Sequence, residues 1–434
     1  MSGPASAHPG GQIEAAHAVA AIPETMRAFV LDGTGLEHAS VRRIPTPRPG
    51  PGQLLGRVDA AGICSSVNKV IGQGPEHSLM YGRDLAAHPA ILGDEGAITV
   101  VAVGEGVPDR FAVNTRYAVQ PAVDAAPVTN CEWYANGGEG VRKVALGYTL
   151  PGLLAEYVLV TREAIDAGCL IPLGDAPVPA AHAAIAEPIS CVISAHAHHL
   201  HIEQPDPTAP RRALVGLRPS GIVVVIGAGA MGRIHVDVAL GSGPRAVVVA
   251  DMVERRLEIV REQFGDRAAR LGVSLVTVNP AVADLRAIVA DLSSGAMADD
   301  VIVAAGSSRA VESAQRLVGR YGVLDLFGGL SADDAVVGLD GRAVHYGEFA
   351  VTGSSGGGPH DLAVAVDLMA AGRIDPGLHI SHVGDLEHTP DFLAMIRDHS
   401  NDGKAVVYPN LRLPLIREVE RWGAADEQTH AGAG

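Results

Sequence analysis

The sequence is short of cysteine, of long apolar runs and of positive charge, and each shortage excludes a class of protein. The chain has four cysteines in 434 residues, and they follow no paired spacing, which argues against a disulfide-bonded secreted fold. No apolar run approaches the roughly 20 residues that cross a bilayer. The first residues lack the basic-then-apolar pattern of a secretory signal. We therefore expect a cytoplasmic protein with buried apolar cores.

Positive charge is scarce as well as scattered. The chain has 33 Lys and Arg against 49 Asp and Glu, which gives a formal net charge of −16. Proteins that bind nucleic acid or an anionic membrane need clustered basic residues, and none stand in blocks here. We therefore expect neither nucleic acid nor a membrane as partner, which leaves small molecules and proteins.

What the sequence does contain indicates an α/β protein of two domains, because its length exceeds what one core usually serves. Short apolar runs between turn signals fill residues 26–190 and predict a β-rich, antiparallel domain. Strands alternate with helices over residues 191–359, which indicates a doubly wound parallel sheet. Residues 360–420 either close this second domain or, as we expect, return to complete the first. Residues 1–25 and 421–434 show no sustained period, so we expect disordered or extended tails.

A glycine-rich turn follows one of the predicted strands. Residues 227–232 read GAGAMG, which matches G-x-G-x-x-G between an apolar strand and a helix-compatible segment, and Asp251 ends the next strand. This context predicts a Rossmann dinucleotide site, and the alternative is a structural turn without a ligand. The residues expected to contact the cofactor are Gly227, Gly229, Ala230, Met231, Gly232, Asp251 and Arg256.

The residues of this turn have separate expected roles. Gly227 permits the tight turn, Gly229 lets the backbone approach a pyrophosphate, and Gly232 lets the helix pack on the strand. Asp251 would accept hydrogen bonds from the adenosine ribose hydroxyls and repel a 2′-phosphate, so NAD is favoured over NADP. Arg256, just beyond it, would soften that preference.

Two adjacent acids, Asp94 and Glu95, stand between glycines and apolar runs in the segment ILGDEGAITV. Buried carboxylates need a cation, a proton or hydrogen-bond donors. Cys64 follows an apolar strand, and Glu187 precedes a proline at the start of a predicted helix. Together they offer one thiolate and three carboxylates, and a catalytic zinc uses three protein ligands. Taken singly, Cys64 also suits a core position, and Glu187 also suits a helix N-terminus.

Four histidines also stand close together, in the segment SAHAHHLHI. They are too close in a helical stretch for all four to converge on one metal. We expect a solvated helix face formed by His196, His198, His199 and His201.

The residues around these candidates resemble a known family. The segments AGICSSVNK, HPAILGDEGAITVVAVGEGV and AEPISCVISAHAH resemble the metal-binding motifs of the medium-chain dehydrogenase/reductase superfamily, in its zinc-dependent alcohol and polyol (sorbitol-type) branch. The closing segments VHYGEFAVTGSSGG and GKAVVYP extend the resemblance to roughly residues 26–415. Within this branch, the segments EPISCVISAHAHHL, GLRPSGIVVVIGAGAMG and NKVIGQGPEH look most like the L-sorbose 1-phosphate reductases.

The resemblance implies a GroES-like catalytic domain carrying the metal, a Rossmann domain and an active site between them. By matching position, it implies that Cys64, Asp94 and Glu187 bind a divalent metal, with Glu95 beside them. Ser66 would pass on the alcohol proton. The metal would polarise a carbonyl or alkoxide oxygen while hydride moves to or from the nicotinamide. Homodimers or homotetramers are usual in the family.

The chain departs from the family pattern at two places. Many relatives bind a structural zinc through four close cysteines, and this chain offers only Cys131 there, so we expect no structural zinc. Asp94 stands where the pattern has histidine. Its carboxylate would bring three negative charges to the metal instead of two, which lowers Lewis acidity and makes manganese or iron stronger rivals to zinc. The alternative is a decayed site in which Asp94 pairs with a nearby cation.

These features predict an NAD-dependent, metal-assisted dehydrogenase acting on a secondary alcohol or ketone of a sugar, polyol or sugar phosphate. Two alternatives stay open. One is a metal-free reductase of the same fold, and the other is a non-catalytic NAD-binding protein. Lys69, Gln73 and His77 are candidates to meet a phosphate or hydroxyl groups, although a solvated loop explains them equally well.

Overall fold

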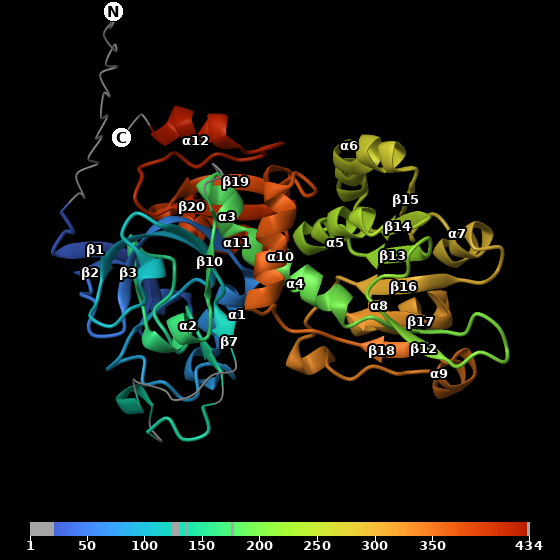
Figure 1. The fold of residues 1–434 in the computed structure, drawn as a ribbon, viewed down its shortest axis with the longest axis horizontal. Helices are drawn as coiled ribbons and strands as arrows, with labels where there is room; N and C mark the ends of the chain where they lie inside the picture. The colour runs from blue at the N-terminus through green and yellow to red at the C-terminus, as the bar shows by residue number, and fades with distance from the viewer. Residues whose placement is uncertain (1–20, 124–130, 135–136, 142, 175–177, 432–434) are drawn as a thin grey trace, which may run out of the picture.

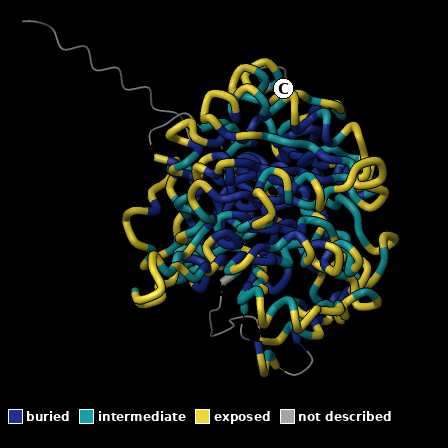
Figure 2. Tube along the Cα trace, turned by 90° about the vertical axis from the view of Figure 1, so that its right-hand side faces the viewer, coloured by how far each residue is buried: buried dark blue, intermediate teal, exposed yellow. Residues whose placement is uncertain are grey.

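The computed structural model describes residues 21–123, 131–134, 137–141, 143–174 and 178–431. Most of the predicted N-terminal tail, residues 1–25, lies outside the described residues. Two lobes stand side by side, one rich in strands and one with alternating strands and helices (Figure 1). Buried residues fill the interior of the molecule, under a mostly exposed or half-buried surface (Figure 2).

The first lobe is built on a seven-stranded sheet of order β10-β6-β5-β3-β20-β19, with β9 paired to β3. Its strands are β3 (Leu54–Ile63), β5 (Glu95–Val103), β6 (Arg116–Val119), β9 (Tyr157–Val160), β10 (Leu170–Pro172), β19 (Ile380–Asp385) and β20 (Lys404–Tyr408). The smaller sheets of this lobe are β2 (Ala39–Pro45), β1 (Thr25–Leu31) and β4 (Ala90–Ile91), and β7 (Ala122–Val123) with β8 (Val144–Ala145). Its helices are α1 (Ser65–Gln73), α2 (Arg162–Asp166), α3 (Ala180–Ala184) and α11 (Thr389–Arg397). The sheet therefore joins segments from both ends of the chain, and β20, near the C-terminus, lies beside β3.

The second lobe is a six-stranded parallel sheet of order β15-β14-β13-β16-β17-β18. Its strands are β13 (Ile222–Ile226), β14 (Ala246–Ala250), β15 (Ser274–Val278), β16 (Ala298–Val303), β17 (Val318–Leu326) and β18 (Ala350–Thr352). Its helices are α5 (Ala230–Gly241), α6 (Glu254–Leu271), α7 (Leu285–Leu292), α8 (Ser308–Ala314) and α9 (Gly341–Gly347). The antiparallel ribbon of β11 (Leu200–Glu203) and β12 (Arg212–Val215) lies near β17. This strand order is that of the dinucleotide-binding fold, as the alternation of strands and helices predicts.

Alternate residues of the central strands explain why helices cover both faces. In β13, Val223 and Val225 pack with α5 and α6, whereas Ile222 and Val224 pack with α7 and α8. A strand buried on both faces needs an unbroken apolar run, and IVVVI supplies one. The carboxyl end of β13 then opens into the glycine turn before α5.

Two helices join the lobes. The chain crosses from the first lobe to the second along α4 (Ala186–Ala197), and α10 (Pro359–Ala370) packs against it (Figure 1). Their apolar side chains share one core with the start of α5, including Ile189, Ile234 and Leu362. Helix α4 therefore begins at the first lobe and ends beside the second, so residues at its two ends have different surroundings.

The C-terminal segment, expected to be a tail over residues 421–434, forms α12 (Ala424–Ala431) in its described part. Glu427 accepts hydrogen bonds from the backbone amides of Ala180 and Ala181, at 3.0 and 2.8 Å, and from the Tyr408 hydroxyl at 2.8 Å. Trp422, just before the helix, is buried. These contacts are long-range, which is why a search for local periodicity does not find the helix.

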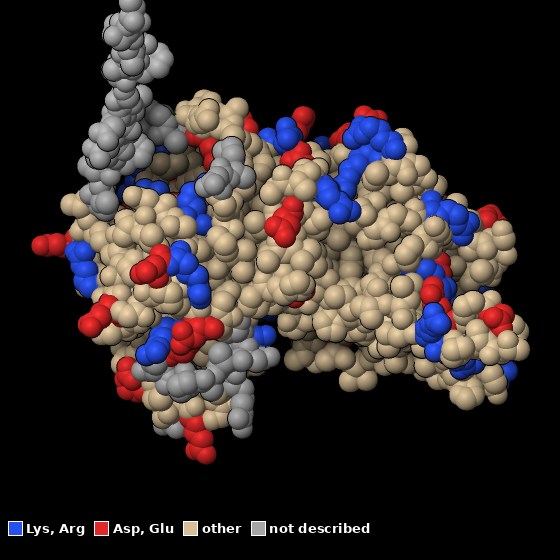
Figure 3. Space-filling view, in the orientation of Figure 1, with Lys and Arg blue, Asp and Glu red and all other residues tan. Residues whose placement is uncertain are grey.

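Among the described residues, no helix combines the length and apolar character that a membrane crossing requires. Basic and acidic side chains are interspersed over the face drawn in Figure 3, without a patch of one sign.

Candidate active site

Three of the predicted metal residues converge in the first lobe. Cys64 follows β3 and precedes α1, and Glu95 begins β5 directly after Asp94. The register of these strands pairs Gly62 with Glu95, so the residues that follow Gly62 lie beside the two acids. One donor atom from each of Cys64, Asp94 and Glu95 lies within 4.8 Å of the others. The fold thus gathers the thiol and two carboxylates.

Glu187 approaches the same cluster from the first turn of α4 and is 9% exposed. Its charge is close enough to raise the pKa of Cys64, after the larger effects of burial and of Asp94 and Glu95. The Cys191 thiol, one helical turn further on, donates to Glu187 Oε1 at 3.2 Å. The four predicted residues therefore form one electrostatic group at the boundary between the lobes.

Two hydroxyl groups fix the orientation of Asp94. Ser66 Oγ donates to Asp94 Oδ2 at 2.8 Å, and the Tyr148 hydroxyl donates to the same oxygen at 3.2 Å. Asp94 Oδ1 has no hydrogen-bond partner among the described residues. Sequence reasoning placed Ser66 here but missed Tyr148, because no local motif connects Tyr148 with Asp94.

Lys404 is the second residue that sequence reasoning missed. It is the first residue of β20, and its Nζ lies 2.5 Å from Glu95 Oε1. Lys404 is 6% exposed and Glu95 1%. Lys404 stands in the segment GKAVVYP, which carries part of the family resemblance in the sequence. Only the pairing of β20 with β3 shows that this lysine lies beside Cys64, Asp94 and Glu95. Glu95 Oε2 remains without a partner among the described residues.

The acidic groups of the cluster outnumber Lys404, the one cation paired with them among the described residues, so protons or a metal ion must neutralise the rest. Burial, followed by the charge of Glu95, raises the pKa of Asp94 to about 6. Burial and the charges of Glu95 and Asp94 raise the pKa of Glu187 to about 8, and burial raises the pKa of the Cys64 thiol well above its usual value. Lys404 is the cation that opposes these groups. The unpartnered Asp94 Oδ1 and Glu95 Oε2 and the thiol fit a divalent metal ion.

The glycine turn has the space that a dinucleotide needs. Gly227 has a φ of +101°, which favours glycine, and a Cβ at Gly232 would lie 1.8 Å from Gly227 O. A Cβ at Gly229 would meet nothing within 4 Å, so the turn is open at this residue. Ala230 and Met231 begin α5 just beyond it. The turn therefore fits the predicted approach of a pyrophosphate to the backbone.

Asp251 is tied to the same turn. Its Oδ2 accepts a hydrogen bond from the Ala228 amide at 2.7 Å, and its Oδ1 accepts one from Val253 at 2.8 Å. Arg256 Nη1 lies 3.9 Å from Asp251 Oδ2 and Arg256 Nε lies 3.6 Å from Asp402 Oδ1. Acidic groups thus hold Arg256 on both sides.

The prediction of a solvated histidine face is wrong for three of its four residues. His196, His199 and His201 are 6%, 0% and 0% exposed, and His198 alone is exposed. The prediction assumed one continuous helix, but α4 ends at Ala197 and the chain continues into β11. The three buried rings pack inside the second lobe, away from Cys64.

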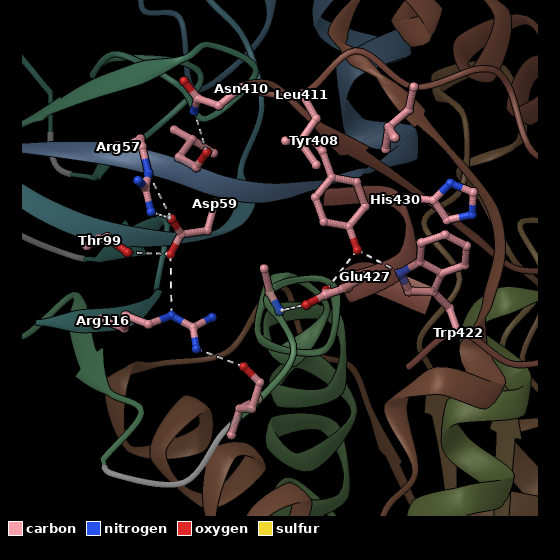
Figure 4. A pocket seen from close by; sticks show the side chains of 14 residues that line it. Arg57, Asp59, Thr99, Arg116, Tyr408, Asn410, Leu411, Trp422, Glu427 and His430 are labelled. Atoms are coloured by element: carbon pink, nitrogen blue, oxygen red, sulfur yellow. Dashed lines mark hydrogen bonds and ion pairs between the residues drawn. The ribbon is translucent and has the colours of Figure 1, made fainter. Parts of the chain in front are cut away.

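A cavity of about 480 Å³ lies elsewhere, between the first-lobe sheet and the C-terminal segment (Figure 4). Its charged side chains are already paired, since Asp59 contacts both Arg57 and Arg116, and Glu427 binds Tyr408. Neither Cys64 nor the acids around it line this cavity. The candidate active site is therefore the group of Cys64, Asp94, Glu95 and Glu187 together with the glycine turn.

Two family models match the chain, one on each lobe. The model described as "Alcohol dehydrogenase GroES-like domain" matches residues 50–168. The model described as "Zinc-binding dehydrogenase" matches residues 230–371. The predicted fold class, a GroES-like domain joined to a Rossmann domain, is thereby confirmed.

Curated proteins match over most of the chain. Mannitol-1-phosphate 5-dehydrogenase of Aliivibrio fischeri is 29% identical over 399 residues, which cover 91% of this chain and 89% of that protein. L-sorbose 1-phosphate reductase of Klebsiella pneumoniae is 26% identical over 373 residues, covering 84% and 83%. Among solved structures, a zinc-binding dehydrogenase from Sinorhizobium meliloti 1021 bound to NADP has a TM-score of 0.69 and 25% identity, covering 89% of this chain and 100% of that chain.

Proposed function

Since this chain belongs to the zinc-type medium-chain dehydrogenase/reductase superfamily, we propose that it transfers a hydride between NAD and a secondary alcohol or ketone of a sugar, polyol or sugar phosphate. It is a dehydrogenase with a nicotinamide cofactor, zinc and a small-molecule substrate. The choice of NAD, the substrate class, the site residues and an assembly of two or four copies are proposals.

One observation carries the proposal: the thiol and carboxylates of Cys64, Asp94 and Glu95 converge, and two carboxylate oxygens there lack any partner among the described residues. Helix α1, which begins beside Cys64, extends to the second lobe, where Lys69 Nζ lies against Gly329 in the loop after β17. That loop follows the carboxyl end of a parallel strand, where Rossmann folds bind their cofactor. The residues proposed to hold the metal and the loop proposed to meet the cofactor therefore lie on opposite sides of the boundary between the lobes.

The residues divide the chemistry between them. Cys64, Asp94 and Glu187, with Glu95 beside them, would hold the zinc, which polarises the substrate oxygen when bound. Ser66 Oγ would take the hydroxyl proton of the alcohol, because the Ser66 hydroxyl proton is donated to Asp94 Oδ2 and leaves the Oγ lone pairs free to accept. Tyr148 holds Asp94 in this orientation, and Lys404 neutralises Glu95.

The test is an activity screen on polyols, sugars and their phosphates with NAD and NADP, run beside elemental analysis of the purified protein. We expect zinc in the protein, turnover with NAD, and loss of turnover on full removal of metal that returns when zinc is added. Activity that survives complete metal removal would identify a metal-free reductase. Binding of NAD without turnover on any of these compounds would identify a non-catalytic protein.

Cofactor choice gives a second prediction. Asp251 is expected to repel the 2′-phosphate of NADP, and two unit charges 4 Å apart near a protein surface interact by about 4 kcal/mol. We expect Asp251→Ser to raise the ratio of kcat/KM for NADP over NAD by about tenfold to hundredfold, at 1.4 kcal/mol for each factor of ten. Steady-state kinetics with both cofactors measure the ratio.

The matched control is Asp266→Ser, which removes an exposed aspartate of α6, the helix that follows Asp251. This variant should leave the ratio unchanged. An equal change in both variants would mean that net charge, and not the position of Asp251, sets the preference.

A further inference from the structure

Two buried histidines and an aspartate converge in the second lobe, in a cluster that the proposed reaction does not use. His199 Nδ1 lies 2.6 Å from Asp300 Oδ1, and His201 Nε2 lies 2.9 Å from the same oxygen. One donor atom from each of the three residues lies within 4.8 Å of the others. All three side chains are fully buried. Three side chains, of two types common in metal sites, therefore meet at one point.

Each of the three residues has a second nitrogen or oxygen atom that points away from the meeting point, here called its outer atom. These outer atoms lie near polar groups, as those of metal ligands usually do. His199 Nε2 lies 3.4 Å from Asp325 Oδ2, and His201 Nδ1 lies 3.1 Å from the Tyr321 carbonyl oxygen. Asp300 Oδ2 accepts a hydrogen bond from the Arg218 amide at 3.0 Å. A histidine that binds a metal typically directs its other ring nitrogen to a carboxylate or a backbone carbonyl, which fixes the ring. His201 has such a partner in the Tyr321 carbonyl, and the Asp325 carboxylate lies near the outer nitrogen of His199.

The protons of the two rings do not suffice for these contacts. A neutral imidazole carries one N–H, yet each ring lies between two acceptors: Asp300 and Asp325 for His199, Asp300 and Tyr321 O for His201. If the outer nitrogens hold the protons, two lone pairs face Asp300 Oδ1 at 2.6 and 2.9 Å. Such an arrangement is repulsive unless a proton or a metal ion binds these atoms.

The charges of the cluster also lack a counterpart among the lysines and arginines that the structure describes. Asp300 and Asp325 are both 0% exposed, and among the described residues no Lys or Arg forms an ion pair with either of them. Both oxygens of Asp325, and His199 Nε2, have no hydrogen-bond partner in the described part of the chain. Two additional protons or one divalent cation would neutralise the two carboxylates equally.

We infer that His199, His201 and Asp300 bind a second divalent transition-metal ion, zinc above all, with Asp325 orienting His199. Two imidazoles and a carboxylate are a donor set that zinc accepts, and iron and manganese are its chemical rivals. Full burial leaves no path for a substrate, so the ion is structural. It ties the end of α4 and β11 to β16 and β17, and α4 carries Glu187 at its other end (Figure 1).

The competing occupant of the cluster is a pair of protons. Burial by itself lowers the pKa of His199, but the hydrogen bond to Asp300 and the contact with Asp325 outweigh it and raise the pKa to about 9. Protons and a metal ion would therefore bind the same nitrogen and oxygen atoms. Measuring the metal content of the protein distinguishes the two hypotheses.

The experiment counts metal in a protein whose proposed catalytic site has been removed. The double variant Cys64→Ser/Glu187→Gln is loaded with zinc and desalted. We expect it to retain one equivalent of zinc, measured by inductively coupled plasma mass spectrometry. Adding His201→Gln should remove this equivalent, whereas adding His198→Gln, at the exposed neighbouring histidine, should retain it. With cobalt in place of zinc, the retained ion should lack thiolate-to-metal absorption, because no cysteine belongs to the cluster.

Each result decides the question. Absence of metal from Cys64→Ser/Glu187→Gln that folds normally by circular dichroism would overturn the inference and assign protons to the cluster. Retention of the same equivalent after His201→Gln would also overturn it. If the triple variant does not fold, adding Asp94→Asn to Cys64→Ser/Glu187→Gln decides: retention of the equivalent supports the histidine site, and its loss assigns the ion to the first-lobe cluster and overturns the inference. Wild-type protein holding one equivalent, unaffected by Cys64→Ser/Glu187→Gln, would support this site and contradict the proposed catalytic metal.

Discussion

Replacing Cys64 with serine is expected to reduce kcat by about three orders of magnitude and to lower zinc occupancy of the active site. Cys64 offers the only thiol within the cluster of Cys64, Asp94 and Glu95, and a thiolate is the donor that favours zinc over harder ions. Polarisation of the substrate oxygen by a metal contributes several kcal/mol, and about 1.4 kcal/mol corresponds to a factor of ten in rate. Steady-state kinetics with metal analysis of the same preparation measure both effects.

The matched variant is Asp94→His, which changes another proposed ligand but supplies a donor that zinc accepts. We expect it to keep its metal and to retain a rate within about tenfold of the wild type, since imidazole is a usual zinc ligand. A Cys64→Ser protein with unchanged rate and unchanged zinc would refute the assignment of the ligands. If Asp94→His loses its metal, or loses rate as far as Cys64→Ser does, the assignment of Asp94 as a ligand that histidine can replace is wrong.

The largest expected loss of stability follows Lys404→Met. Methionine keeps much of the side-chain volume but leaves Glu95, at 1% exposure, without the ammonium group that lies 2.5 Å from its Oε1. Removing one partner of a buried ion pair typically costs about 3–5 kcal/mol, because a charge remains buried without compensation. The expected result is a lower free energy of unfolding of the first lobe, measured by urea denaturation and by thermal unfolding.

The control is the double variant Lys404→Met/Glu95→Gln, in which neither charge remains. If the unpaired carboxylate causes the loss, the double variant should recover most of it, because the two residues are in contact and their effects are not additive. A double variant as unstable as Lys404→Met would show that the cost arises from packing around Lys404 and not from Glu95.

The architecture was largely predictable from local patterns. The run IVVVI in β13, followed by the glycine turn and a helix, specifies a buried parallel strand because only such a strand tolerates apolar residues on both faces. The same patterns fail for α12, whose sequence has little apolar character of its own and which docks through Glu427 to Ala180 and Ala181. A helix held by distant backbone amides leaves no periodic signal in its own residues.

The candidate site was predictable in part, for a comparable reason. Asp94 and Glu95 are recognisable because two acids inside an apolar segment violate the usual pattern of burial, and such a violation is visible locally. Lys404 and Tyr148 are not recognisable, because each acts through a contact with a residue far away in the chain. Histidines 199 and 201 were misassigned because their burial depends on where α4 ends and on the strands it reaches.

The sequence by itself determined that the chain contains a dinucleotide turn, a thiol and three acids of the right kind, because these are properties of residue type and short spacing. Only the tertiary structure decided which charges oppose one another. Lys404 is 309 residues from Glu95 in the chain, and His199 is 101 residues from Asp300. The free energy of a buried charge depends on the groups around it, and strand pairing, not local sequence, brings those groups together.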